Sequence, residues 1–145
     1  MSFRIERIVE FADTDMAGIV HFSNYFKWME SAEHAFFRSL ALPIIEKEEA
    51  FIKGWPRGRV SCQYKKPLRF QDTVIIELSV AEVLSQAIRY VFSFYKLDEA
   101  SEEVLVARGE MTTVCAAFDR EDGSLQACAI TEAVREQIKV ELSVG

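Results

Sequence analysis

Residues 22–40 read FSNYFKWMESAEHAFFRSL, and this stretch decides the fold. Its apolar side chains recur three and four positions apart, which is the spacing of one face of an α-helix. Ser23 or Asn24 can cap the start, and Pro43 marks the end. The sequence therefore predicts one long helix with a heavily packed aromatic face, followed by a second, shorter helical piece over 44–51.

The segments on either side of this helix alternate apolar and polar residues, as strands do. Strands are expected over 3–11, 57–66, 73–84, 87–97 and 103–118. The last three are joined by short turns and should form an antiparallel meander. After a turn near residue 120, a closing helix is expected over 130–142, with Thr131 as its cap and Glu132 in its first turn.

A long apolar helix beside one antiparallel sheet predicts an α+β fold. The chain has 145 residues and is 50% hydrophobic, which suits a single domain over 1–145. One helix covers only one face of such a sheet, so the apolar residues of the outer face indicate that a second subunit covers part of it, in a homodimer or homotetramer. These outer-face residues are Val91, Tyr95, Leu105 and Met111.

Composition narrows the class of protein. The formal net charge of −6 argues against nucleic acid as the main partner. No run approaches the roughly 20 apolar residues of a membrane span, and the first residues do not resemble a signal peptide. The 3 cysteines form no CxxC pattern, and only 2 histidines are present. We therefore expect a cytoplasmic protein with reduced, core-packed cysteines, no membrane contact and no metal.

The charge is unevenly distributed along the chain. Residues 53–69 carry six basic side chains and no acidic one. A cationic stretch in an acidic protein can hold a polyanion such as a nucleotide phosphate tail. A charged edge strand that resists aggregation would have the same composition. The six residues are Lys53, Arg57, Arg59, Lys65, Lys66 and Arg69.

Residues 11–25, FADTDMAGIVHFSNY, carry the clearest candidate chemistry. Asp13 and Asp15 precede Gly18 and the start of the long helix. The first amides of a helix lack partners within it, so they can hold a carbonyl oxygen and stabilise an oxyanion. A carboxylate just upstream can attack that carbonyl or activate a water. A thioester suits this minimal machinery because its thiol leaves easily, although ordinary helix capping would use the same residue types.

Two motifs resemble the 4-hydroxybenzoyl-CoA thioesterase family of hotdog-fold enzymes. Residues 13–25, DTDMAGIVHFSNY, resemble its N-terminal signature, and residues 64–72, YKKPLRFQD, resemble its Y-x-x-P-L-R-x-x-D block. The order of elements matches over nearly the whole chain. The resemblance implies a hotdog fold, in which one long helix packs on a five-stranded antiparallel sheet with a short C-terminal helix. It also implies an acyl-CoA thioesterase without a cofactor, because coenzyme A enters as part of the substrate.

The resemblance implies catalytic roles position by position. The catalytic carboxylate falls on Asp15, the turn glycine on Gly18, and the amide that polarises the thioester carbonyl on the backbone of Phe22. Relatives that act on short acyl chains often have a histidine at this last position. Here the histidine comes one residue earlier, so His21 is either a substrate contact or a structural residue. Asp13 is expected to organise the loop.

Further substrate contacts are expected beside the long helix, in a pocket that the resemblance places at a subunit interface. Asn24 and Tyr25 could border the acyl group, although Tyr25 fits the core equally well. Trp28 could line the pocket or a subunit contact. The coenzyme A phosphates are expected at a basic patch drawn from Arg57, Arg59, Lys65, Lys66 and Arg69.

Three polar residues of the helix, Glu30, Glu33 and His34, are expected to form pairs on the helix surface. Nothing in their spacing connects them with the reaction.

The acyl group itself stays open between aromatic acyl-CoA, of hydroxybenzoyl or dihydroxynaphthoyl type, and aliphatic acyl-CoA or acyl-carrier protein. A non-catalytic acyl-CoA-binding hotdog module is the alternative from another class of protein. Asp15 disfavours it, because binding alone has no need for a carboxylate beside an anionic ligand. A purely structural oligomerisation domain would leave the D-x-A-G motif unexplained.

Overall fold

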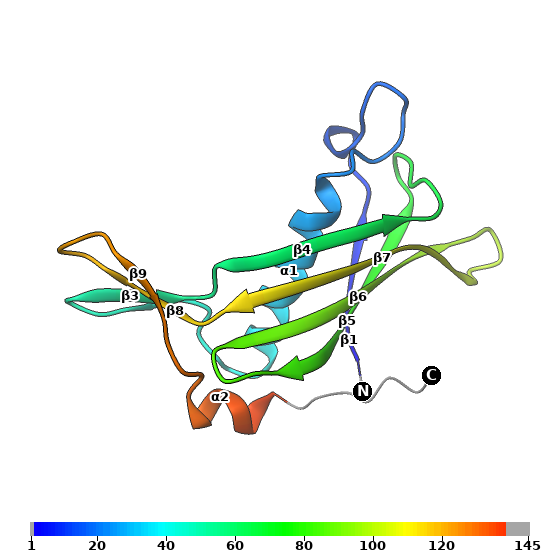
Figure 1. Ribbon diagram of the computed structural model, residues 1–145. Coiled ribbons are helices and arrows are strands. Elements are labelled where there is room, and N and C mark those ends of the chain that lie inside the picture. The colour runs from blue at the N-terminus through cyan, green and yellow to red at the C-terminus, as the bar shows by residue number, and fades with distance from the viewer. Residues whose placement is uncertain (1, 139–145) are drawn as a thin grey trace.

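The computed structural model describes residues 2–138, and its main body is one antiparallel sheet with a helix across one face (Figure 1). Its strands occur in the order β1-β5-β6-β7-β4. The helix α1 spans Asn24–Ser39. The predicted long helix on a five-stranded antiparallel sheet is confirmed. The five strands are β1 (Phe3–Ile8), β4 (Arg57–Tyr64), β5 (Thr73–Val83), β6 (Ala87–Leu97) and β7 (Glu103–Val114).

The aromatic stripe of α1 packs against the inward face of the sheet, as predicted. Met29, from the middle of this stripe, lies directly on Gly109 of β7, where any Cβ would collide with the methionine side chain. Glycine at this position therefore lets the helix approach the sheet closely. The predicted inward faces of β5 and β6 are also confirmed, because their alternate apolar residues are buried. These are Val74, Ile76, Leu78, Val80, Ile88, Tyr90, Phe92 and Phe94.

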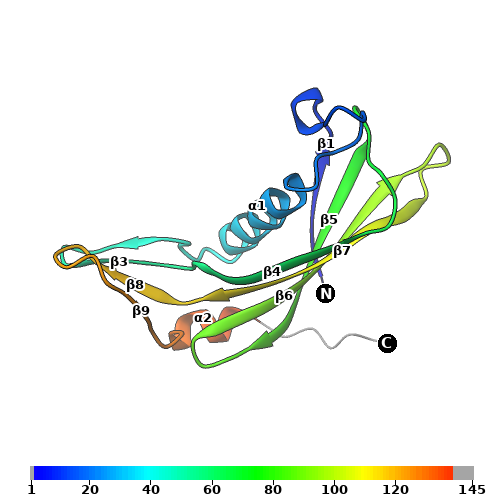
Figure 2. The ribbon, with the colours of Figure 1, turned by 45° about the horizontal axis from the view of Figure 1, so that its top comes forward.

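A second, four-stranded sheet forms an arm that projects from one end of the molecule (Figure 2). The arm strands are β2 (Glu46–Lys47), β3 (Phe51–Gly54), β8 (Ala116–Asp119) and β9 (Leu125–Ala127). The helix predicted over 44–51 is wrong, because this segment forms part of the arm. β2 pairs with the neighbouring β3, which in turn pairs with the distant β8, and this strand pairing overrides the helical preference of the Glu and Lys residues. The strand predicted over 103–118 is divided at Cys115.

A bulge in β7 changes which residues face outward. The register between β6 and β7 shifts at Val106, which has no partner on β6. An extra residue in one strand reverses the alternation of side chains beyond it. Leu105 is therefore partly exposed with Val91 and Tyr95, whereas Met111 is only 2% exposed. The prediction that placed Met111 on the outer face is wrong for this reason.

The last helix of the described residues is α2 (Glu132–Gln137), which begins after Thr131 as predicted. The Val134 amide donates a hydrogen bond to the Thr131 hydroxyl at 3.4 Å. The helix predicted to residue 142 ends earlier, and residues 139–142 lie outside the described part of the chain. Neither helix within residues 2–138 combines the length and apolar character that crossing a membrane requires.

Glu33 lies in the core and not on the helix surface, so its predicted surface pairing is wrong. Its side chain is 0% exposed, and Nη1 of Arg57 lies 2.8 Å from its Oε1. Nη2 of the same guanidinium lies 2.9 Å from Glu30. Arg57 thus ties the start of β4 to the middle of α1. Burial raises the pKa of Glu33 to about 7, although Arg57 acts in the opposite direction.

Deprotonation of the buried Glu33 carboxyl should make the protein less stable as the pH rises. The folded state keeps the Glu33 proton up to a pH of about 7, whereas the unfolded chain releases it near the ordinary value of 4.5. The unfolded state therefore binds fewer protons in this window, and the free energy of unfolding falls by something on the order of 3 kcal/mol. Chemical denaturation at pH 5 and pH 8 measures the effect.

Glu33→Gln should flatten this pH dependence, because glutamine does not titrate. Glu30→Gln is the matched control, since it removes the exposed carboxylate on the same arginine and should keep the dependence. An equal fall in stability in wild type and Glu33→Gln would contradict the assignment to Glu33.

Candidate active site

Asp15 lies in a tight loop between a 3-10 turn at Phe11–Asp13 and α1. The Asp15 amide donates to the Ile19 carbonyl at 2.8 Å, and the Gly18 amide donates to the Asp15 carbonyl at 3.0 Å. Gly18 has a φ of 79°, in the left-handed region that favours glycine, so the predicted turn is present. Oδ1 of Asp15 accepts the Ala17 amide at 2.8 Å. Within residues 2–138, no donor holds the other oxygen, Oδ2.

Asp13 joins this loop to the start of α1. Its carbonyl oxygen accepts hydrogen bonds from the His21 amide and from the Asn24 side-chain amide, each at 2.8 Å. Its carboxylate accepts the Glu10 amide at 2.8 Å. Asp13 therefore organises the loop, as expected. The same contacts commit the Asn24 amide group to the loop, and Asn24 does not line the cavity described below.

Phe22 lies just ahead of α1, where helix amides lack partners. Among the described residues, none accepts a hydrogen bond from the Phe22 amide. Its ring is 60% exposed and stacks on the His21 ring, with centroids 4.5 Å apart. Nδ1 of His21 lies 2.8 Å from the Ser23 hydroxyl. The His21 ring is thus engaged locally at the helix entry, where the Phe22 amide has no acceptor among the described residues.

Asp15 and Phe22 share the wall of an open cavity of about 540 Å³. Both ribbon views place the Asp15 loop beside the connection between β4 and β5 (Figures 1 and 2), and the Val20 amide donates to the Leu68 carbonyl at 2.8 Å. Asp15 thus lies in the wall of a cavity, and no basic side chain within residues 2–138 forms an ion pair with it. The remaining wall residues are Ile19, Val20, Tyr25, Tyr64, Lys65, Lys66 and Pro67.

The predicted cationic contacts divide into two groups. Lys65 and Lys66 lie in the cavity wall, on the strand end that faces the Asp15 loop. Arg59 and Arg69 are exposed but lie outside this wall. Arg57 also lies outside it, because its guanidinium is ion-paired to the glutamates of α1. The structure therefore brings two of the five predicted cations to Asp15.

Tyr25 and Trp28, two predicted aromatic contacts of the substrate, lie in different places relative to the cavity. Tyr25 lies in the cavity wall yet is only 3% exposed, so it serves the core as well. Trp28 is 2% exposed and packs on Tyr25, with centroids 5.4 Å apart, away from the cavity wall.

Tyr64 belongs to the site and was missed as a site residue by the sequence reasoning. Its hydroxyl donates to the Phe22 carbonyl at 3.0 Å, and its ring meets Tyr25 edge-on at 5.0 Å. Partial burial raises the pKa of this hydroxyl to about 12, which keeps it a proton donor at neutral pH. The available signal was its place as the first residue of YKKPLRFQD.

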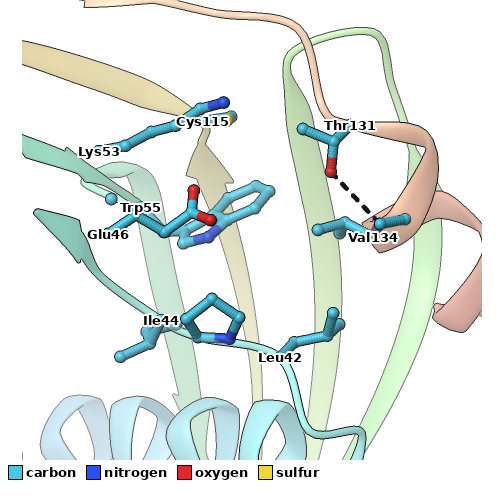
Figure 3. A pocket seen from close by; sticks show the side chains of 11 residues that line it. Leu42, Ile44, Glu46, Lys53, Trp55, Cys115, Thr131 and Val134 are labelled. Atoms are coloured by element: carbon cyan, nitrogen blue, oxygen red, sulfur yellow. Dashed lines mark hydrogen bonds between the residues drawn. The ribbon is translucent and has the colours of Figure 1, made fainter. Parts of the chain in front are cut away.

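A second cavity, of about 100 Å³, lies at the base of the arm, beside β3 and α2 (Figure 3). Leu42, Ile44 and Trp55 give it a mainly apolar wall, with Glu46 and Lys53 from the arm. It is much too small for an acyl-CoA. No three metal-binding side chains cluster anywhere in residues 2–138. The cavity that brings Asp15 and Phe22 together with two lysines is the candidate active site.

The chain matches the family model of the thioesterase-like superfamily over residues 9–138. It is also similar to the 4-hydroxybenzoyl-CoA thioesterase of Pseudomonas sp. strain CBS-3, with 27% identity over 122 residues, covering 83% of this chain and 86% of the relative.

Two solved structures share the architecture. The gentisyl-coenzyme A thioesterase BH1999 has a TM-score of 0.76 and 30% identity, over 94% of this chain and 99% of that chain. A variant of 4-hydroxybenzoyl-CoA thioesterase complexed with 4-hydroxybenzoyl-CoA has a TM-score of 0.81 and 20% identity, over 95% and 99% of the two chains. The predicted hotdog fold is confirmed.

The turn at Gly18 can be tested with a matched pair of glycines. Gly18 and Gly123 both have positive φ, of 79° and 74°, and both have open space where a Cβ would lie. Alanine at either position should cost about 1 kcal/mol through backbone strain alone. Thermal unfolding should show a similar fall in Tm, of about 3 °C, for both variants.

Only Gly18→Ala should also impair a reaction that depends on Asp15, because only Gly18 shapes that loop. Turnover measured beside Tm separates the two effects. An equal loss of turnover in Gly123→Ala would contradict a specific role for the Gly18 turn.

Proposed function

We propose, from the premise that this chain belongs to the thioesterase-like superfamily, that it hydrolyses acyl-CoA thioesters with the Asp15 carboxylate and the Phe22 amide. Membership of this family makes the chain an enzyme of the acyl-CoA thioester hydrolase class. The single observation that carries the assignment of Asp15 is its position. Asp15, whose Oδ2 accepts no hydrogen bond from a described residue, shares a cavity wall with Phe22, whose amide has no acceptor among the same residues.

The two groups supply complementary parts of the reaction. The Phe22 amide donates a hydrogen bond to the thioester carbonyl oxygen, and this bond strengthens as negative charge develops on that oxygen. Oδ2 of Asp15 either attacks the carbonyl carbon or takes a proton from the attacking water. The thiolate of coenzyme A leaves, and water supplies the oxygen of the carboxylic acid product.

A thioester needs little more than this pair of groups. A thiol is a far better leaving group than an alcohol, with a pKa of roughly 8.5 for a cysteine-like thiol. A dedicated general acid is therefore unnecessary. Besides Asp15, the titratable residues of the cavity wall are Tyr25, Tyr64, Lys65 and Lys66.

The cavity wall offers one region for the coenzyme A phosphates and another for the acyl group of the substrate. Lys65 and Lys66 supply positive charge for the coenzyme A phosphates. Tyr25, Tyr64 and Pro67 supply flat apolar surface near the reacting carbonyl. This surface suits an aromatic acyl group, the class of substrate named for the 4-hydroxybenzoyl-CoA and gentisyl-coenzyme A relatives.

The proposed active form is a homodimer or homotetramer. β4 is an edge strand of the large sheet and is exposed along most of its length. An exposed edge offers unpaired backbone groups to another chain. A second subunit placed along this edge would also close the open side of the cavity, next to Tyr64 and Lys65.

Asp15→Asn should abolish most turnover while retaining substrate binding. The asparagine keeps the shape of the side chain but can neither attack the carbonyl nor accept a proton, so kcat should fall on the order of 10²-fold or more. A thiol-trapping assay over aromatic and aliphatic acyl-CoAs measures turnover, and calorimetry measures binding.

Asp13→Asn is the control for this variant, because its side-chain oxygen can still accept the Glu10 amide; kcat should fall far less. If the wild type binds acyl-CoA but shows no turnover across the panel, the chain is a binding module instead.

The two lysines should affect only substrates that carry nucleotide phosphates. Each exposed ion pair contributes up to about 1 kcal/mol, so Lys65→Ala and Lys66→Ala should each raise KM for acyl-CoA by up to about 5-fold. The N-acetylcysteamine thioester of the same acid has no phosphate, and its KM should stay unchanged.

Lys47→Ala, which removes an exposed cation from the arm, should leave both substrates unaffected. Equal KM increases for both substrates in the Lys65 and Lys66 variants would show that these lysines do not bind the phosphates.

A further inference from the structure

Tyr64 connects two parts of the site that are 42 residues apart in sequence. It is the last residue of β4, and its hydroxyl donates to the carbonyl oxygen of Phe22 at 3.0 Å. The side chain is 46% exposed, so this contact lies at the surface of the cavity and not in the core. The packing of the core therefore does not require this hydrogen bond.

The contact fixes the peptide group that follows Phe22, and a second contact fixes the one that precedes His21. The His21 amide donates to the Asp13 carbonyl at 2.8 Å. The free Phe22 amide lies between these two anchored points. Its direction depends on the backbone torsions of His21 and Phe22, and the carbonyl held by Tyr64 limits the second of these.

Tyr64 is itself held firmly enough to act as an anchor. Its ring packs edge-on against Tyr25 at 5.0 Å, and its backbone pairs with Ala107 of β7. The next amide along the chain, of Lys65, donates to the Val106 carbonyl at 2.8 Å. At the other end of β4, Arg57 is ion-paired to α1. The strand that carries Tyr64 is thus fixed relative to the helix that Phe22 precedes.

We propose that Tyr64 is a positioning residue for thioester hydrolysis, whose hydroxyl holds the Phe22 carbonyl so that the Phe22 amide points at the substrate oxygen. This role rests on the proposed function of the cavity and adds a residue to it. An amide that must find its direction during the reaction loses part of its stabilisation of the oxyanion, because such donors act by being preorganised. Tyr64 therefore affects the chemical step and not substrate affinity.

The kinetic test is Tyr64→Phe, which removes only the hydroxyl. Loss of one neutral hydrogen bond should lower kcat by up to about 10-fold, with KM for an aromatic acyl-CoA and Tm little changed. Tyr95→Phe is the matched control, because it removes a tyrosine hydroxyl from β6 outside the cavity; its kcat should equal that of wild type. A rise in KM with unchanged kcat, or an unchanged kcat, overturns the proposal.

A second measurement observes the contact directly, without turnover. Protein labelled with carbonyl-¹³C phenylalanine and ¹⁵N serine gives correlations only for Phe-Ser pairs, and the sequence has two, Phe22–Ser23 and Phe92–Ser93. Tyr64→Phe should shift the Phe22 carbonyl resonance and leave that of Phe92, which lies in β6, unchanged. An unshifted Phe22 carbonyl shows that the hydrogen bond is absent, and the proposal then fails.

The two measurements separate failure of this proposal from failure of the proposed function. If wild type hydrolyses thioesters and the carbonyl shifts but kcat does not fall, the positioning role is wrong and the function stands. If wild type hydrolyses none of the panel, the proposed function falls, and the positioning role falls with it even where the carbonyl shifts.

Discussion

The carbonyl oxygen of Asp13 accepts hydrogen bonds from the His21 amide and the Asn24 side chain, and the site depends on this pair of contacts. They hold the loop that carries Asp15 against the start of α1. They join the segment that carries the proposed catalytic carboxylate to the segment that carries the Phe22 amide, beside the Thr14–Val20 bridge and the hydrogen bond from the Asp15 amide to the Ile19 carbonyl. Catalysis by two groups requires that both reach the same carbonyl at once, so this local constraint matters more than the strength of either group alone.

The large sheet gives this constraint a rigid support. β4 reaches α1 through the ion pair of Arg57 with the buried Glu33, and it reaches the segment just before α1 through the hydrogen bond of Tyr64 to Phe22. At the bulge in β7, the Val106 carbonyl accepts hydrogen bonds from the amides of Lys65 and Lys66, at 2.8 and 3.0 Å. The end of one edge strand therefore carries the hydroxyl proposed to orient the oxyanion donor, and the two residues that follow it are the cations proposed for the coenzyme A phosphates. The core beneath it needs only to keep the helix and strand in register.

Much of the fold follows from periodicity, because the long helix and the main strands each bury one face. The segment over 44–51 could not be predicted this way, since its strand β2 pairs with the neighbouring β3, and β3 in turn pairs with β8, far along the chain. The inward orientation of Met111 could not be predicted either. The alternation of apolar and polar residues along β7 does not reveal the bulge at Val106 that reverses which face Met111 occupies. The buried position of Glu33 could have been predicted, however, because Glu33 lies four residues after Met29 and four before Phe37, within the apolar stripe.

The site was predictable only where a motif marks it. Asp15, Gly18 and Phe22 lie in one short stretch, so their proximity followed from the sequence alone. The distribution of the five cations did not, because exposure and pairing depend on neighbours from other elements. Arg57 and Lys65 both lie in the basic stretch over 53–69. The guanidinium of Arg57, however, forms ion pairs with two glutamates of α1. Tyr64 was visible as part of a motif, yet its partner atom is a backbone carbonyl that no sequence pattern indicates.

The most direct test of the central claim is a crystal structure of the Asp15→Asn variant soaked with an uncleaved aromatic acyl-CoA. The proposed mechanism requires the thioester oxygen to lie about 2.7–3.1 Å from the Phe22 amide nitrogen, and the carbonyl carbon about 3–3.5 Å from the side chain at position 15. A thioester bound with its carbonyl turned away from Phe22, or held at the base of the arm instead, would contradict the account.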